Sequence, residues 1–507
     1  MRGLFFSSLL AALAATLLVP LTLACVHVPP KGGFDTVETL TAERGASGAA
    51  WSTQTEERDA ALAHSTALLQ GELSLQQAVE VALLRNPSLQ ARYEAIGIGE
   101  ADLIAAGLPP NPVFSGAIMP RVSPGLGIQE SFDLAQNMLQ LLLLPARKDL
   151  VSKEFEATKL WVAHDVIALV TSVHSAYYEL VARQNLLASL RAIDEANRVS
   201  VEYAVGLHAA GNLSERDLAS QQSLREETHL RVLEAQAEVV EARVRLARFL
   251  ATQPEEDSWR VPEKLPSLPP SDPAAEALAL QAADERLDVL AARATAEAFR
   301  QALGLARRWR WIPLLEVGVS SERQPEGGWN VGPSLSLELP IFQQGQTNVA
   351  RLEAALRRSE RELEAARLNA RSDVREAAAR LAGARARAER LRDQTIPTRE
   401  RLVELTQQEF NYMLIGAFDL LIAKRDELST YRAYLDAIRD YWVAFSDLEA
   451  GVGRRLEVAQ GPTSPPSPSP GNPPPSEALA AEPPPSGSNL PATSEQVHTH
   501  DHRHGDH

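Results

Sequence analysis

The chain has 507 residues, 66 of them acidic and 50 basic, which gives a formal net charge of −16, and only 5% of its residues are aromatic. This charge disfavours nucleic acid as a partner, and the chain has no run of Lys and Arg of the kind that binds nucleic acid. Few aromatics beside abundant Ala, Leu, Glu and Arg indicate long packed helices rather than several ordinary domains.

The first 24 residues are predicted to form a signal peptide, in which Arg2 precedes an apolar run from Leu4 to Leu23. Cys25 follows directly and is the only cysteine, so no intrachain disulfide can form. A Cys in this position resembles the lipobox of bacterial lipoproteins, which implies lipidation of Cys25. The alternative is ordinary cleavage beside an incidental Cys, and both interpretations predict export. No later stretch reaches ~20 consecutive apolar residues, so no membrane-spanning helix is expected after the signal peptide.

An irregular arm is predicted over residues 25–72, because prolines, glycines and scattered Ser and Thr recur there. The first firm helix begins at Ser74, which has the spacing of a capping box with Gln77. This helix should end near Gly107, since the two prolines that follow cannot continue it.

The remaining chain repeats one architecture, over residues 73–252 and again over residues 272–455. Each repeat has a helix, a Pro-rich break, a β-hairpin, a Leu-Pro pair and a long helical hairpin. The predicted β-hairpins span residues 112–144 and 312–341, and residues 253–271 form the linker. An offset of about 200 residues indicates a duplication, because solenoid repeats have periods of ~20–50 residues. The second helix should start with Asp272 as its N-cap and a proline at the first helical position.

The second β-hairpin has the clearer pattern. Apolar residues alternate with polar or small ones at Leu315, Val317, Val319, Leu335, Leu337 and Leu339. Such alternation is typical of a transmembrane barrel strand, and tryptophans at both ends of the hairpin suit interfacial girdles. The alternative is an amphipathic hairpin on a soluble domain. An isolated two-stranded hairpin is barely stable in water, so these hairpins are expected to need further strands.

The long helical hairpins carry apolar or small residues at spacings of three and four, which is typical of a coiled-coil seam. The helix from about Pro145 to His208 would be roughly 90–100 Å long at ~1.5 Å per residue. Each hairpin turns at a glycine, Gly211 or Gly416, predicted to adopt the left-handed conformation. Ser214 and Asp419 are the predicted N-caps of the returning helices.

These features resemble the TolC-type outer-membrane efflux family over roughly residues 73–452. The resemblance is carried by the opening LSLQQAVEVALLRNPSL at Leu73, by Leu144-Pro145-Ala-Arg147 and Leu339-Pro340-Ile-Phe342, and by the two glycine-containing turns. Among family members, the lipobox-like start and the His-rich tail look most like the CzcC-type components of heavy-metal efflux systems.

The resemblance implies a homotrimer, in which four strands from each of three chains close a 12-stranded β-barrel in the outer membrane. The helices would form an α-barrel in the periplasm, with the Cys25 lipid on the periplasmic side. The helical tips would meet a periplasmic adaptor bound to an inner-membrane pump of the RND type. The docking and gating residues implied are Gly211, Leu213, Ser214, Asp217, Gly416, Phe418, Asp419 and Leu420.

Three carboxylates are expected to face the lumen of the barrel, where they would favour cations: Asp133, Glu316 and Glu338. Residues 456–507 form a Pro/Ser-rich tail that should stay extended. It ends in a segment with His498, His500, His502, His504 and His507. Imidazoles at this density suit divalent transition metals, although a solvated polar terminus is the alternative.

No catalytic motif occurs, so neither an enzyme nor a cofactor is expected. The predicted function is a passive trimeric duct, with divalent heavy-metal cations as the expected cargo. One alternative is a duct for organic toxicants. Another is a soluble periplasmic coiled-coil lipoprotein that acts as a scaffold; an adaptor is disfavoured because no compact lipoyl-like β module is indicated.

Overall fold

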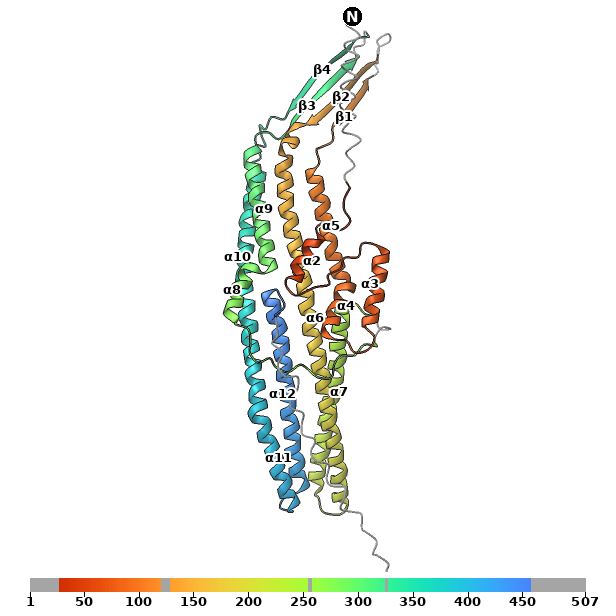
Figure 1. The fold of residues 1–507 in the computed structure, drawn as a ribbon, viewed down its shortest axis with the longest axis vertical. Coiled ribbons are helices and arrows are strands. Elements are labelled where there is room, and N and C mark those ends of the chain that lie inside the picture. The colour runs from red at the N-terminus through yellow and green to blue at the C-terminus, as the bar shows by residue number, and fades with distance from the viewer. Residues whose placement is uncertain (1–26, 120–127, 254–257, 324–326, 457–507) are drawn as a thin grey trace, which may run out of the picture. The chain divides into compact units, whose positions relative to one another are not determined.

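The computed structural model describes residues 27–119, 128–253, 258–323 and 327–456 (Figure 1). These residues form a bundle of long helices with a four-stranded sheet at one end. Within the described part, no helix is both long enough and apolar enough to span a bilayer. The predicted fold class, mainly helical with long hairpins and a small β part, is confirmed.

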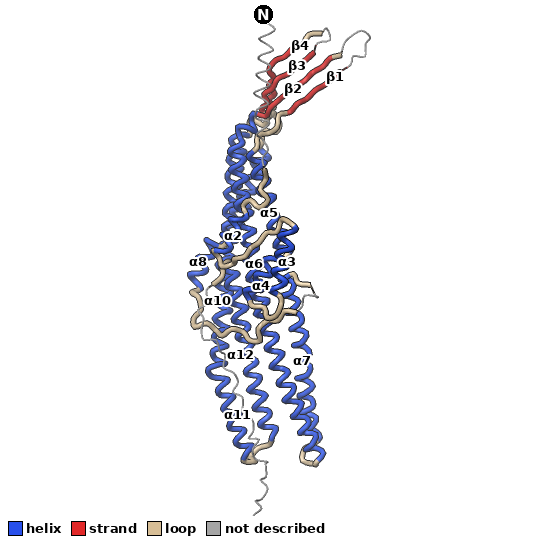
Figure 2. The backbone as a smooth tube through the Cα atoms, turned by 45° about the vertical axis from the view of Figure 1, so that its right-hand side comes forward, coloured by secondary structure: helices blue, strands red, loops and turns tan. Residues whose placement is uncertain are grey.

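The same order of elements occurs twice along the chain (Figure 2). The first repeat contains α4 (Leu75–Arg85), α5 (Pro87–Gly107), β1 (Val113–Met119), β2 (Gln129–Asn137), α6 (Met138–Ala209) and α7 (Glu215–Leu250). The second contains α8 (Ala275–Glu285), α9 (Leu287–Trp309), β3 (Leu315–Arg323), β4 (Trp329–Leu337), α10 (Gln346–Arg390), the π-helix η3 (Leu391–Thr395), α11 (Ile396–Asn411) and α12 (Ala417–Val452).

Local sequence explains several helix ends. Ser74 and Gln77 form the expected capping box at the start of α4. Asn86 caps α5 by accepting a hydrogen bond of 3.1 Å from the backbone N–H of Leu89, and Pro87 takes the first helical position. The π-turn η3 precedes Pro397, which has no N–H to donate to the carbonyl four residues earlier, so the hydrogen-bond register shifts there.

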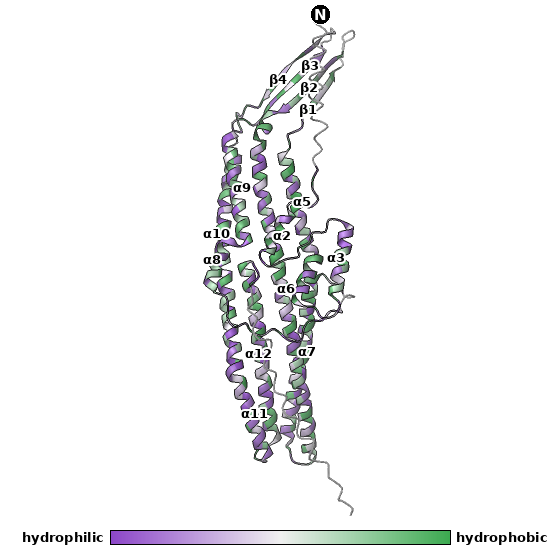
Figure 3. Cartoon of the chain, viewed as in Figure 1, coloured by the Kyte–Doolittle hydropathy of each residue, from purple (hydrophilic) through white to green (hydrophobic). Residues whose placement is uncertain are grey.

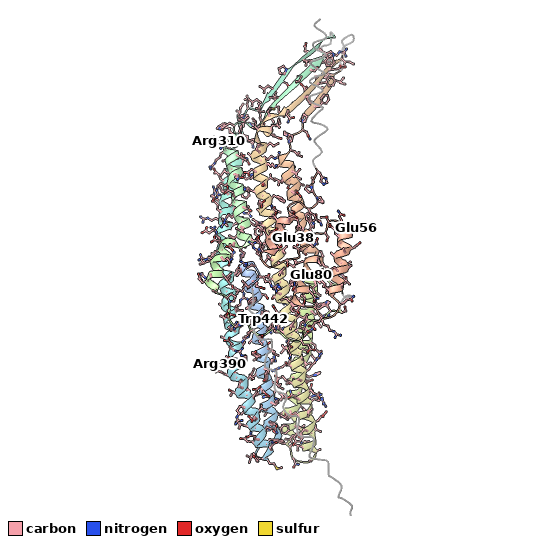
Figure 4. The ribbon with its side chains drawn as sticks, in the orientation of Figure 1. Glu38, Glu56, Glu80, Arg310, Arg390 and Trp442 are labelled. Atoms are coloured by element: carbon pink, nitrogen blue, oxygen red, sulfur yellow. The ribbon has the colours of Figure 1, made fainter. Side chains whose placement is uncertain are left out.

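The sheet is antiparallel in the order β1-β2-β3-β4, so β2 pairs with β3 and joins the two repeats. Below the sheet, the helical core also joins them, because α6 packs along α12. Tyr178 of α6 stacks on Trp442 of α12 with ring centroids 5.1 Å apart, and Trp442 lies midway along the bundle (Figure 4).

A buried arginine links three helices of the second repeat. The Arg286 side chain is 8% exposed and binds both oxygens of Asp288 at 2.8 Å. It also donates to Asp373 of α10 at 2.8 Å and to the carbonyl of Gly451 in α12 at 3.2 Å. One guanidinium therefore ties the start of α9 to two other helices.

The N-terminal arm is not irregular as predicted, since it contains α2 (Phe34–Ala42) and α3 (Thr55–Leu68). Phe34 is buried edge-on against Tyr93 of α5, with centroids 5.1 Å apart, and Trp51 is buried beside it. Helices this short depend on tertiary packing for their stability, which local sequence patterns do not reveal.

Two predicted boundaries are wrong. The first β-hairpin ends at Asn137 and not at residue 144, because the Asn137 side chain accepts a 2.9 Å hydrogen bond from Gln140 N–H and starts α6. Pro145 lies inside α6, where it has no N–H to donate to the carbonyl four residues earlier. Asp272 does not cap α8, since its carboxylate accepts hydrogen bonds from Arg385 at 2.7 Å and Tyr441 at 2.8 Å.

Candidate functional site

The register of the sheet divides its side chains into two faces of opposite character. The face that includes Asp133 is mostly polar or small, with Ser115, Gln129, Ser131, Asn137, Glu316, Gly318, Ser320, Glu322, Asn330, Ser334 and Ser336; Val113 and Met119, the first and last residues of β1, are its large apolar side chains. The opposite face is mostly apolar, with Phe114, Ile118, Phe132, Leu134, Leu315, Val317, Val319, Trp329, Val331, Leu335 and Leu337; its polar residues are Gln136, Ser321 and the ion pair of Glu130 with Arg323. Polar and apolar residues accordingly interleave along the four strands (Figure 3).

The apolar face is uncovered in the single chain. Phe114 is 68% exposed, Val331 67% and Leu335 70%. Soluble proteins rarely leave an apolar patch of this extent in water, so the face is suited to lipid. β1 and β4 are the outer strands of the sheet and have no partner strand on their free edges in the described part of the chain.

Aromatic side chains mark both ends of the sheet. Trp329 begins β4 opposite Arg323, at the end far from the helices, and its ring lies 6.2 Å from Phe132. At the other end, Trp311 is 51% exposed beside Arg310, whose guanidinium lies 4.4 Å from the indole centroid. Two aromatic bands at the ends of apolar strands are the arrangement found in membrane barrels.

Of the three predicted lumen carboxylates, the structure places Asp133 and Glu316 on the polar face. Glu338 lies one residue beyond β4, where its backbone N–H reaches the Leu314 carbonyl at 3.4 Å. Glu322 was not among the predicted carboxylates. It also lies on the polar face and accepts a 2.5 Å hydrogen bond from Gln129. Extending the alternation of Glu316, Gly318 and Ser320 by two residues would have found it.

The first helical tip has the predicted conformation. Gly211 has φ +77, and the Asn212 N–H closes the turn onto the Leu207 carbonyl at 2.9 Å. Ser214 caps α7 by accepting from the Asp217 N–H at 3.1 Å. Hydrogen bonds from Ser214 and Arg216 lower the pKa of Asp217. These hydrogen bonds stabilise the folded tip fully at any pH above the ordinary pKa of an Asp side chain. Their effect is lost only as the pH falls through the lowered pKa of Asp217, so it is intact at neutral pH.

The second tip differs from the prediction. Gly416 has φ −82 and ψ 160, so it is not left-handed but occupies the N-cap position of α12. The left-handed residue is Met413, at φ +56. Asp419 is not the N-cap; it lies three residues further on, and its carboxylate accepts from the Gly416 N–H at 3.2 Å. Gly416 thus corresponds to Ser214, and Asp419 corresponds to Asp217.

The apolar side chains that are exposed at the tips are not among the docking residues that the resemblance implied. Leu213, Phe418 and Leu420 are half-buried, and the Phe418 ring lies 6.1 Å from Tyr203 of α6, which joins the two hairpins. The exposed group is instead Tyr412, Met413 and Leu414, at 78%, 93% and 72%. Aligning the two turns on their N-caps, and not on their glycines, would have singled out these three residues.

A pair of substitutions tests this account of the tips. Gly211→Ala should destabilise the end of the α6–α7 hairpin by about 1 kcal/mol, because a side chain strains a left-handed residue. Gly416→Ser should not destabilise α12 and should add a few tenths of a kcal/mol, since Ser is a better N-cap. Amide hydrogen exchange of the two tips is the measurement; faster exchange in Gly416→Ser would contradict the assignment.

Two predicted sites lie outside the described residues: Cys25, and the tail histidines 498–507. In the part of the chain that is described, no group of three or more His, Cys, Asp or Glu side chains has the geometry to hold a metal ion. The histidines there serve packing or local pairs, such as His174 with Glu449.

Comparison with known proteins, like the lipid-suited face of the sheet, indicates an outer-membrane protein. A family model described as outer membrane efflux protein matches residues 278–454, most of the second repeat. No curated protein matches the sequence. Among solved structures, the chain resembles the outer membrane protein VceC of Vibrio cholerae, with a TM-score of 0.63 and 17% identity, over 76% of this chain and 97% of that one.

Two further structures share the fold. The CmeC outer membrane channel of Campylobacter jejuni has a TM-score of 0.64 and 15% identity, over 75% of this chain and 85% of that one. CusC, described as forming a transmembrane channel, has a TM-score of 0.60 and 17% identity, over 75% of this chain and 92% of that one. At these identities the likeness concerns the fold.

The resemblance of the sequence to the TolC-type outer-membrane efflux family is therefore confirmed. The family match and the fold support an outer-membrane efflux channel of tripartite systems, and the channels of that family are passive ducts and not enzymes. They do not distinguish heavy metals from other cargo, since channels of several efflux systems share this fold.

Proposed function

We propose that three copies of this chain close a 12-stranded barrel (3 × 4 strands) in the outer membrane and form a passive export duct. The observation that carries the proposal is the exposed apolar face of a sheet whose two edges are open. Four strands cannot close a membrane barrel, since such barrels have at least eight. Two copies would reach eight, and the family resemblance favours three.

The helices extend well beyond the membrane in this arrangement. α6 has 72 residues and would be roughly 108 Å long at ~1.5 Å per residue, against a hydrocarbon core of ~30 Å. The tips of α6–α7 and α11–α12 then lie deep in the periplasm, where they would meet an adaptor bound to an inner-membrane RND-type pump. The docking surface proposed there includes Gly211, Ser214, Asp217, Gly416 and Asp419, together with the exposed group at residues 412–414.

A lipid on Cys25 is compatible with this placement. Gly33 packs against Phe155, which lies 17 residues after the start of α6 (155 − 138), or roughly 26 Å below the sheet. The eight residues from Cys25 to Gly33 (33 − 25) span at most ~26–29 Å. The anchor could therefore reach the periplasmic surface of the membrane.

We propose divalent heavy-metal cations as the cargo. Carboxylates on the polar face of the sheet, a His-rich tail at residues 498–507 and the fold shared with CusC support this choice. A duct for organic toxicants is the second candidate, since the fold by itself does not select a cargo. A soluble lipoprotein scaffold is disfavoured by the uncovered apolar face.

The proposed function has a direct test. The full chain should be extracted from outer membranes only by detergent, as a heat-sensitive complex with the mass of three chains. A deletion strain should lose tolerance to several divalent metals, and removing residues 494–507 should weaken metal tolerance in part. Extraction of a monomer by carbonate would exclude the duct. Sensitivity of the deletion strain to organic compounds alone would mean that these compounds, and not metals, are the cargo.

Charge substitutions on the polar face test the cation preference. Glu316→Gln should lower cation-over-anion permeability roughly threefold at low salt, because each trimer loses a ring of three lumen charges. Glu338→Gln, just outside the strand, should have a smaller effect. Glu130→Gln is the matched control, since Glu130 lies on the opposite face beside Arg323. Unchanged selectivity in Glu316→Gln would contradict the lumen assignment.

A further inference from the structure

A cavity of about 780 Å³ lies where the N-terminal arm meets both repeats, away from the sheet and the tips. It is bounded by the end of α2, by α4, α6, α8 and by the end of α12. Its volume is within the usual range for small-molecule sites, which is ~300–1,000 Å³.

Three arginines line this cavity without an ion pair among the described residues; Arg44 and Arg454 are half-buried and Arg455 is exposed. Arg44 donates only to backbone carbonyls, those of Leu40 at 3.1 Å and Glu285 at 3.3 Å. The side chains of Arg454 and Arg455 make no hydrogen bond or ion pair within the described structure. Most other arginines of the bundle are paired with Asp or Glu, so this cluster is unusual.

The acidic residues of the cavity do not neutralise the cluster. Glu449 is 3% exposed; one oxygen pairs with His174 Nδ1 at 2.9 Å and the other accepts from the Leu456 N–H at 2.9 Å. Glu43 is exposed and makes no ion pair in the described structure. A positive surplus therefore remains, in a chain whose net charge is −16.

Burial is the main cause that lowers the pKa of Arg44; the charge of Glu43 opposes it, the charge of Arg454 adds to it and the charge of Glu285 opposes it. A bound anion would supply the missing counter-charge. Guanidinium groups bind carboxylate and phosphate oxygens in pairs, which a lysine cannot reproduce.

The other walls indicate the size and nature of the ligand. Leu75, Leu278 and Phe445 are apolar and can contact a carbon skeleton, while Tyr178 and Gln281 add polar groups. We propose that this cavity binds a small anion with at least two carboxylate or phosphate groups, held by Arg44, Arg454 and Arg455. The lining residues lie away from the sheet and the tips, so the test of this site does not depend on the proposed function.

The test uses the full chain purified in detergent and titrated calorimetrically with citrate or pyrophosphate in chloride buffer. We expect saturable binding of one anion per chain. The double variant Arg454→Gln/Arg455→Gln should weaken it at least about tenfold, because charge-assisted hydrogen bonds are lost. Neither side chain makes a hydrogen bond or an ion pair within the described structure, so the variant should fold, and an unchanged thermal transition would verify this.

The matched control is Arg358→Gln/Arg361→Gln, since both arginines are exposed on α10 and pair within their own helix. This control should bind as tightly as the unmodified chain. Tighter binding of citrate would assign the site to carboxylates, and tighter binding of pyrophosphate to phosphates. Absence of saturable binding, or equal affinity in the Arg454→Gln/Arg455→Gln variant, would overturn the proposal.

Discussion

Val319→Arg should prevent assembly in the outer membrane, whereas Ser320→Arg in the next position should assemble normally. Val319 is midway along β3 on the apolar face, 46% exposed and opposite Pro333. An arginine facing lipid at the bilayer midplane costs about 2–4 kcal/mol, and a trimer would carry it three times. Ser320 faces the other way, opposite Asp133, which can pair with the new charge.

The measurement is the amount of heat-sensitive trimer extracted from outer membranes, with total expression as the reference. Because the two variants change adjacent residues of one strand to the same side chain, they differ only in the face that receives the charge. Normal assembly of Val319→Arg would show that the apolar face does not meet lipid. The proposed 12-stranded barrel would then be wrong.

Arg286→Ala should have the largest effect on the stability of the helical bundle. Removing the guanidinium leaves the carboxylate of Asp288 buried, at 14% exposure, without its partner. Breaking a buried ion pair by removing one member typically costs about 3–5 kcal/mol. Amide exchange at the start of α9 and in the facing parts of α10 and α12 should accelerate by about 100-fold or more.

Arg375→Ala is the matched control for this prediction. Arg375 also binds a carboxylate through two nitrogens, that of Glu276, but the two side chains are 54% and 64% exposed. Exposed pairs contribute about 0–1 kcal/mol, so exchange should change little. If the two variants behaved alike, Arg286 would not hold the second repeat together.

The two repeats share one sheet and one helical core. β2 pairs with β3, and α6 packs along α12, so neither repeat completes its sheet or its core alone. Arg286 links the start of α9 to α10 and α12, and Trp442, midway along the bundle, packs α12 on α6. The tip hairpins meet through Phe418 and Tyr203.

Local chemistry alone determined much of this protein. The capping box at Ser74, the left-handed Gly211 and the alternation of Leu315, Val317 and Val319 each act within a few residues, so they are legible in the sequence. The duplication is equally visible, since both repeats keep the order of their turn and cap residues.

Only the tertiary structure decided the rest. The arm folds into α2 and α3 because Phe34 finds Tyr93 about 60 residues away in the sequence, a contact that no short-range pattern encodes. Arg286 and Asp272 look like ordinary surface or capping residues until burial brings them their partners. At the second tip, Met413 takes the left-handed conformation that the sequence assigned to Gly416, because the start of α12 places that glycine at the N-cap. Short-range rules predict which conformations a residue favours, and packing selects among them because its free energy exceeds these local preferences.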